Sequence, residues 1–194
     1  MGNSGATITF YTGKLGSGKT IAMVIDAFLA YYGGSILLSN MKELKLKNFY
    51  FRVDDALALM DMLNPERKYT FILDEASGEA DNRDFFSLKN KKFSKFISQA
   101  RKRNIDVIYA SPWISSVEKR LRELTDYIVR CKAIRDPNDD NPKTNLIGLY
   151  YRKYDVEEER MKRYYISAQT AKFFYKYYNT KEFIEDTSGV MLES

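Results

Sequence analysis

Short apolar runs alternate with longer amphipathic segments along the first two thirds of the chain. The apolar runs are rich in β-branched and aromatic residues and predict strands at residues 7–12, 35–39, 70–74, 105–111 and 127–133. The segments between them predict helices at residues 19–31, 55–63, 86–103 and 116–124. This alternation predicts βαβ units, and therefore an α/β fold with a mostly parallel sheet flanked by helices.

The pattern changes after residue 133. Residues 135–143 are dense in Asp, Asn and Pro and predict an exposed loop. This loop joins the run at 127–133 to a second apolar run at 146–151, so we expect a β-hairpin with a long polar tip. Residues 156–163 are highly charged and predict a solvated segment. Residues 167–178 then predict an aromatic C-terminal helix with Ser167 as its N-cap.

The composition supports a folded protein and excludes several kinds of chemistry. The 194 residues are 44% hydrophobic and 14% aromatic and contain no internal repeat, so we expect a single domain over residues 1–194. The chain has no histidine, which excludes a Ser-His-Asp triad and a zinc site of the usual His kind. Its single cysteine, Cys131, excludes an internal disulfide framework and is expected to be a buried thiol.

The charge balance bears on partners and location. A formal net charge of +5 favours polyanionic partners such as nucleic acid, although an ordinary basic protein has the same balance. No apolar stretch is long enough to cross a bilayer, and the N-terminus lacks the pattern of a signal peptide. We therefore expect a soluble protein of the cytoplasm.

Residues 13–20 match the phosphate-binding P-loop pattern G-x-x-x-x-G-K-[ST] at every fixed position. The match follows a predicted strand and precedes a predicted helix, which is the context that this loop requires. Glycines let successive backbone N–H groups point at the phosphates, and the helix dipole adds positive potential. Lys19 would reach the β- and γ-phosphates of ATP, and Thr20 would ligate Mg²⁺. The nucleotide-binding residues are Gly13, Lys14, Leu15, Gly16, Ser17, Gly18, Lys19 and Thr20.

Two carboxylates follow the apolar run at 70–74. Asp74 ends the predicted strand and Glu75 comes directly after it. Ligands of parallel α/β sheets lie beyond the carboxyl ends of the strands, so both side chains are expected beside the P-loop. Asp74 would hold Mg²⁺, and Glu75 would polarise the water that attacks the γ-phosphate. The alternative is a strand that ends in solvated acids, but the P-loop upstream favours the catalytic interpretation.

The class of P-loop protein can be narrowed further. A Glu directly after the Asp favours ATP hydrolysis over phosphoryl transfer to a small molecule. The interval between Lys19 and Asp74 leaves room for another strand and helix. Both features resemble the additional-strand, catalytic-glutamate class of P-loop ATPases. A GTPase is disfavoured because no Asn-Lys-x-Asp guanine motif follows.

Further segments resemble the FtsK–HerA superfamily of P-loop ATPases. In QARKRNIDVIYASPW (99–113) an Ala-Arg-containing helix runs into a strand that ends in a polar residue. The segments ILDEA (72–76), SSVEKRLRELTDYIV (115–129) and TAKFFYKYYNTKEF (170–183) look like those of zonula-occludens-toxin-like and viral genome-packaging ATPases. The resemblance spans residues 7–183, and its specific motifs are the P-loop and the Asp74–Glu75 strand.

This resemblance implies a DNA-translocating motor, commonly a hexameric ring in which a neighbour's arginine completes the ATP site. We expect this arginine finger to be Arg83, Arg101 or Arg103, although surface arginines are more often solvated. Ser111 corresponds to the polar sensor residue. Many relatives have a polar–Gln pair there, whereas this chain has Ser111 and Pro112, so a plain strand-to-loop residue is an equal alternative.

The resemblance also implies partners. Double-stranded DNA would be held through its phosphates by the basic stretches at 89–95 and 101–103, unless these form a solvated helix face. A viral packaging ATPase would also meet a capsid or portal-vertex protein in the host cytoplasm. Two other functions stay open. One is a membrane-associated phage assembly or secretion ATPase, whose relatives tend to carry a transmembrane segment. The other is a nucleotide or small-molecule kinase, which would need an acceptor-binding lid.

Overall fold

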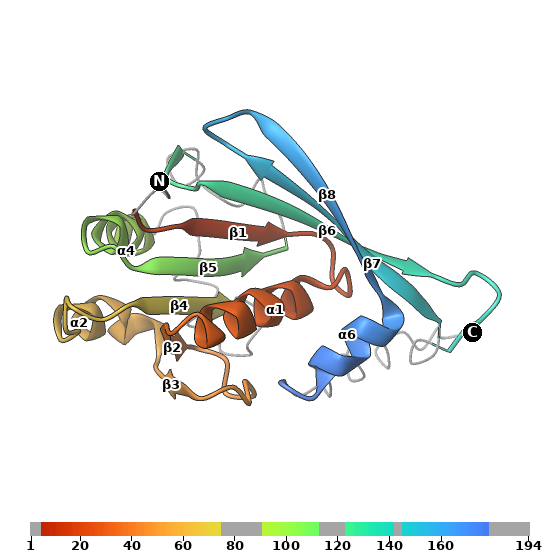
Figure 1. Cartoon of the computed structure of the whole chain (residues 1–194), viewed down its shortest axis with the longest axis horizontal. Coiled ribbons are helices and arrows are strands. Elements are labelled where there is room, and N and C mark those ends of the chain that lie inside the picture. Colours follow the sequence, from red (N-terminus) through yellow and green to blue (C-terminus); the bar gives the residue numbers. More distant parts are fainter. Residues whose placement is uncertain (1–4, 75–90, 113–122, 142–144, 179–194) are drawn as a thin grey trace, which may run out of the picture.

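The computed structural model describes residues 5–74, 91–112, 123–141 and 145–178. Within these ranges an eight-stranded sheet has the order β3-β2-β4-β5-β1-β6-β7-β8 (Figure 1). Neighbouring strands from β3 to β6 pair in parallel, whereas β7 and β8 are antiparallel additions at one edge. The strands are β1 (Ile8–Thr12), β2 (Ile36–Ser39), β3 (Asn48–Tyr50), β4 (Tyr69–Asp74), β5 (Asp106–Ser111), β6 (Tyr127–Arg135), β7 (Leu146–Asp155) and β8 (Arg160–Ser167).

Helices cover both faces of the sheet, and each face has its own apolar core. On one face α2 (Ala56–Asp61), preceded by the short helix η1 (Val53–Asp55), and α4 (Lys91–Lys102) pack with large side chains that include Phe10, Phe71 and Tyr109. On the other face α1 (Lys19–Tyr32) and α6 (Ala168–Tyr175) pack with Ile72 and Leu149 among others. The predicted α/β class, a mostly parallel sheet flanked by helices, is confirmed. No helix in the described ranges is long and apolar enough to span a bilayer.

The order of the central strands confirms the additional-strand prediction. β5 lies between β1 and β4, so one strand separates the P-loop strand from the strand that ends in Asp74. The inserted strand follows β4 in the chain, and the interval between Lys19 and Asp74 holds β2, β3 and α2 instead. In register, Thr12 faces Ser111 across β1 and β5, and Asp74 faces Ala110 across β4 and β5.

The C-terminal part differs from the prediction in one element. The predicted hairpin is confirmed and is longer, since β6 runs to Arg135 and β7 to Asp155. The charged segment at 156–163 is exposed as expected, but its second half begins β8, which pairs with β7 along its whole length. Because β8 is an edge strand with exposed residues on both faces, it lacks the alternating apolar pattern by which a strand is recognised. The helix predicted at 116–124 falls almost wholly outside the described residues.

Two local predictions are confirmed. The Ser167 hydroxyl accepts a hydrogen bond from the Thr170 N–H at 3.2 Å and so caps α6. The aromatic side chains of this helix then pack on α1, with Phe174 and Phe28 ring centroids 5.5 Å apart. Cys131 is buried, and this burial raises the pKa of its thiol to about 12, which keeps it protonated.

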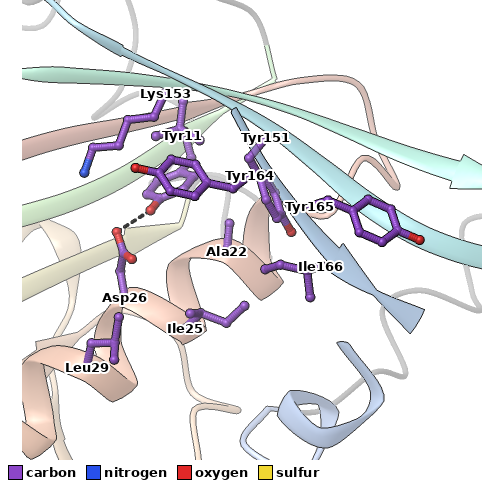
Figure 2. Close-up of a pocket in the computed structure, with 11 residues that line it drawn as sticks. Tyr11, Ala22, Ile25, Asp26, Leu29, Tyr151, Lys153, Tyr164, Tyr165 and Ile166 are labelled. Carbon is purple, nitrogen blue, oxygen red and sulfur yellow. Dashed lines mark hydrogen bonds between the residues drawn. The ribbon is translucent and has the colours of Figure 1, made fainter. Parts of the chain in front are cut away.

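A pocket of about 360 Å³ lies between α1 and strands β6–β8 (Figure 2). In it the Tyr11 hydroxyl of β1 donates a hydrogen bond to the Asp26 carboxylate of α1. Burial raises the pKa of Asp26, while the Tyr11 hydroxyl and the Lys153 ammonium act in the opposite direction. The Tyr11–Asp26 pair links the helix that follows the P-loop to the strand that precedes it.

The raised pKa of Asp26 predicts a pH-dependent cost to stability. The folded chain binds this proton more tightly than the unfolded chain, so stability falls as pH rises from the ordinary value near 3.8 towards the raised value. Asp26→Asn removes the titration and still accepts from Tyr11. We expect this variant to gain stability relative to wild type as pH rises from 4 to neutrality, because only the wild type has to lose the proton of Asp26 in its folded state. Urea unfolding of both proteins at pH 4 and at neutral pH measures the free energies of unfolding. A difference between the two proteins that is the same at both pH values would contradict the prediction.

Candidate nucleotide-binding site

The loop between β1 and α1 is a tight turn built on glycine. Gly13, Gly16 and Gly18 have φ values of 151°, 70° and 89°, which side-chain-bearing residues rarely adopt. A β-carbon at Gly13 would lie 2.6 Å from both the Cys131 carbonyl oxygen and Ser17 Oγ, so only glycine fits there. Gly18 precedes α1, whose first turn has no side-chain cap. The backbone N–H groups of this turn are therefore directed at a potential anion.

Two polar side chains of the loop suit a phosphate ligand. Lys19 is only 9% exposed, and its ammonium donates to the carbonyl oxygens of Gly13 at 2.8 Å and Lys14 at 3.1 Å. It thus bends back over the loop instead of extending into solvent. Ser17 Oγ is buried and has no hydrogen-bond partner among the described residues. A buried hydroxyl without a partner is costly, and a phosphate oxygen at this position would remove the cost.

The two residues expected to ligate Mg²⁺ lie together. Thr20 Oγ1, in the first turn of α1, donates to Asp74 Oδ2 at the end of β4 over 3.1 Å. Asp74 is 3% exposed, so its carboxylate is held at the bottom of the site. The described residues contain no group of three His, Cys, Asp or Glu side chains that could hold a metal ion by themselves. This set fits Mg²⁺, which binds through one or two protein groups together with phosphate oxygens and water.

Asn40 is a site residue that the sequence analysis missed. It follows β2, and its side-chain Nδ2 donates to the Asp74 carbonyl oxygen at 3.0 Å, while the Asp74 N–H donates to Asn40 Oδ1 at 2.8 Å. Asn40 is 3% exposed, so this pair of bonds is shielded from water. It fixes the backbone of Asp74 and thereby the direction of its carboxylate. The available signal was the position of Asn40 after a strand, but the pairing of β2 with β4 cannot be read from the sequence.

The hairpin β6–β7 supports the P-loop from the side of α1. The buried Tyr151 hydroxyl donates to the Gly18 carbonyl oxygen at 3.2 Å. Leu149 packs so closely that a β-carbon at Gly18 would lie 2.7 Å from its Cδ2. The Cys131 carbonyl oxygen of β6 lies equally close to Gly13, since it would be 2.6 Å from a β-carbon there. The sequence analysis assigned no such role to these strands.

The other predicted site residues are placed as follows. Ser111 is buried at the end of β5, in register with Thr12, which directly precedes the P-loop. It therefore lies at the same carboxyl ends of the strands as the P-loop. Its role as a sensor stays a prediction. Glu75 and Arg83 lie outside the described residues, so their predicted roles are not tested.

Arg101 lies in the last turn of α4 and Arg103 directly follows this helix, at the amino-terminal ends of the central strands. Arg101 pairs with Asp126 and donates to the Leu124 carbonyl oxygen at 3.1 Å, and Asp126 also accepts from the N–H of Ile8, the first residue of β1. Arg103 pairs with Asp61 and donates to the Met60 carbonyl oxygen at 2.9 Å. Because the P-loop follows the opposite end of β1, neither arginine is near the nucleotide site of its own chain.

The fold and the P-loop have counterparts among known proteins. The structure is similar to the N-terminal domain of zonular occludens toxin from Neisseria meningitidis, with 16% identity over 90% of this chain and 100% of that one, and a TM-score of 0.58. It is also similar to the genome packaging NTPase B204 from Sulfolobus turreted icosahedral virus 2 in complex with ATPγS, with 15% identity over 84% and 98% of the two chains and a TM-score of 0.60.

A third similar structure is the KaiC-like protein PH0186 from Pyrococcus horikoshii OT3, with 13% identity over 82% and 84% of the chains and a TM-score of 0.54. The chain thus has the fold of P-loop NTPases. No curated protein sequence matches it. The family model described as zonular occludens toxin (Zot) matches residues 7–158, which is most of the chain. The chain therefore belongs to the zonular occludens toxin (Zot) family.

Proposed function

We propose that the chain is an ATPase that uses ATP hydrolysis to move double-stranded DNA, as a viral genome-packaging motor. The observation that carries the ATPase part is the 3.1 Å contact between Thr20 Oγ1 and Asp74 Oδ2 beside the P-loop. This contact supports the proposal, because a hydroxyl and a carboxylate beside a P-loop are the groups that hold the metal of MgATP. Similarity to a genome packaging NTPase that was solved with ATPγS supports the motor part.

Each residue of the site has its own role in binding or hydrolysing ATP. When a triphosphate binds, the Lys19 ammonium exchanges the carbonyl oxygens of Gly13 and Lys14 for phosphate oxygens. Ser17 Oγ and the N–H groups at the start of α1 donate to the same phosphates. Thr20 and Asp74 would hold Mg²⁺, which when bound would neutralise charge on the phosphate oxygens. Glu75, directly after Asp74, accepts a proton from the attacking water.

The proposal includes a ring of subunits, commonly a hexamer, with ATP between neighbours. Arg83, Arg101 or Arg103 acts as the finger that stabilises charge on the transferred phosphoryl group. Arg101 and Arg103 lie away from their own P-loop, so either acts on a neighbour's ATP, after release of Asp126 or Asp61. Ser111 binds the attacking water or a γ-phosphate oxygen. A capsid or portal-vertex protein in the host cytoplasm anchors the ring.

A second candidate is the phage assembly or secretion ATPase working at a membrane that the sequence resemblance left open, and the match to the Zot family supports that resemblance. The two candidates differ in where the ATPase is held while it works. Fractionation of infected cells separates them, because a packaging motor is recovered with capsids and a secretion motor with membranes.

The motor proposal predicts ATP hydrolysis that responds to DNA. We expect duplex DNA to raise the ATPase rate of the full chain several-fold, because a translocating motor couples turnover to its track. Lys19→Ala should abolish both the basal and the stimulated rate, since it removes the charge that meets the phosphates. A steady-state phosphate-release assay with and without duplex DNA measures this. An ATPase rate that duplex DNA does not change would favour a kinase or another NTPase. Turnover by Lys19→Ala at the wild-type rate would refute the assignment of the nucleotide site.

The position of Asn40 predicts a specific loss of activity. Asn40→Ala removes both bonds to the Asp74 backbone, and loss of such a support for a metal ligand costs roughly 10- to 100-fold in metal affinity or activity. We expect the Mg²⁺ concentration for half-maximal hydrolysis to rise accordingly. Asn48→Ala is the matched control, because Asn48 also binds two backbone carbonyls, those of Leu44 and Leu46, at the far edge of the sheet. Equal Mg²⁺ dependence of the two variants would contradict a role for Asn40 at the metal.

The role of Glu75 predicts a separation of binding from chemistry. Glu75→Gln keeps the size of the side chain and removes the base, so we expect ATP to bind normally while hydrolysis falls about 10²- to 10⁴-fold. Equilibrium binding of a fluorescent ATP analogue and single-turnover hydrolysis measure the two steps. An unchanged hydrolysis rate would mean that another group activates the water.

A further inference from the structure

The antiparallel edge of the sheet is strongly basic. β6, β7 and β8 are the longest strands and extend past the parallel part of the sheet (Figure 1). Asp155 is the only acid among their residues. Their basic residues are Arg130, Lys132, Arg135, Arg152, Lys153, Arg160, Lys162 and Arg163. This is a different surface from the basic stretches at 89–95 and 101–103 that the sequence analysis proposed for DNA.

Three of these arginines form one row across the strands. Arg130 of β6 is in register with Arg152 of β7, and Arg152 is in register with Arg163 of β8. Directly opposite residues of neighbouring strands share a face of the sheet, so the three side chains leave the same face. All three are exposed, and within the described residues none has an acidic partner in an ion pair.

This row does not serve the stability of the fold. Like charges directly opposite one another on neighbouring strands are destabilising. Positive residues on an edge strand can prevent unwanted pairing, but that explains Arg163 of β8 alone, because β6 and β7 are interior strands. A local arrangement that opposes stability indicates a functional surface.

Tyrosines flank the arginine row on the same face. Tyr150 of β7 is in register with Lys132 of β6 on one side and with Tyr165 of β8 on the other. Each tyrosine lies two residues from the arginine of its own strand, and therefore on the same face. The Tyr165 hydroxyl donates to the Ile147 carbonyl oxygen at 3.2 Å, and its ring lies so close to Gly148 that a β-carbon there would approach the ring to 2.6 Å. The ring is thus fixed against β7 and is still 55% exposed. Such a ring offers a flat surface on which a nucleic-acid base can stack.

The opposite face of the same strands contacts the nucleotide loop. Cys131 and Tyr151, which directly neighbour Arg130 and Arg152 along the chain, support Gly13 and Gly18. Force on the arginine row therefore acts on strands that pack directly against the P-loop. This connection joins a surface for a polyanion to the site of ATP hydrolysis.

We propose that the Arg130–Arg152–Arg163 row binds the phosphate backbone of DNA and couples its position to the P-loop. The inference rests on the proposed DNA motor and assigns its DNA-binding surface. Strands lie about 4.8 Å apart, so the row spans roughly 10 Å. One strand of DNA presents a phosphate about every 3.4 Å, which gives about three phosphates along the row. The planar guanidinium group binds phosphate through paired hydrogen bonds, which suits this partner.

The test compares two variants of the full chain. One carries Arg130→Gln, Arg152→Gln and Arg163→Gln together. The control is Arg160→Gln, which lies on the same strand as Arg163 at odd spacing, hence on the opposite face, and is paired with Glu158 at 3.0 Å. Fluorescence anisotropy with labelled single- and double-stranded DNA, between about 50 and 200 mM salt, gives affinities and their salt dependence. Thermal unfolding and ATP-analogue binding are measured on the same samples.

For the triple variant we expect DNA affinity to fall at least roughly ten-fold and the slope of log affinity against log salt to shrink by about 2–3, one for each lost phosphate contact. Stimulation of the ATPase by DNA should be lost with it. ATP-analogue binding should be unchanged and the unfolding temperature no lower than in wild type, because like-charge repulsion is removed. The control should bind DNA with a salt slope close to that of wild type.

Three outcomes overturn the inference. Equal DNA affinity and salt slope for wild type and the triple variant would leave the motor proposal intact and reject the arginine row. Co-sedimentation with phosphatidylserine vesicles is measured for the same proteins. If the triple variant bound these vesicles more weakly than wild type but bound DNA equally well, the row would be assigned to a lipid surface. Failure of wild type to bind either form of DNA at low salt would reject both this assignment and the DNA motor.

Discussion

The anchoring of Asp74 is the constraint on which the rest of the site depends. Its carboxylate accepts from Thr20 at the start of α1, while its backbone is held on both sides by Asn40 at the end of β2. Three segments that are distant in the sequence thus meet at one point. Because β5 separates β4 from β1, this meeting depends on the whole parallel sheet and not on one neighbouring pair of strands. A shift in any of the central strands would move the carboxylate relative to the loop.

The parts of the site that could be predicted are those whose residues are contiguous in the sequence or directly end a predicted strand. The P-loop is a continuous run of residues, and Asp74 could be assigned because ligands of parallel sheets lie at the carboxyl ends of the strands. Asn40 lies 34 residues from Asp74, and nothing local marks it as its partner. Tyr151 lies 133 residues from Gly18 and looks in the sequence like one aromatic residue among many. These contacts arise from strand order, which the apolar pattern does not specify.

The same reasoning explains how the fold compares with its prediction. Strands buried on both faces, such as β4 and β5, have continuous apolar runs and were recognised within one or two residues. β8 has exposed residues on both faces and takes its structure from its pairing with β7, so its charged sequence indicated only exposure. The basic surface of β6–β8 was missed for the same reason. Arg130, Arg152 and Arg163 are scattered along the chain and form a row only through the register of the hairpin.

The bent position of Lys19 has a consequence for turnover. Its ammonium already satisfies two carbonyl oxygens of the loop before any phosphate arrives, so nucleotide binding exchanges hydrogen bonds and does not simply add them. When the product leaves, carbonyl oxygens of the same loop can replace it as hydrogen-bond acceptors for the buried Lys19 ammonium. Affinity is thereby moderated at the residue that contributes most charge, and release of the spent nucleotide is eased in a cycle that must repeat.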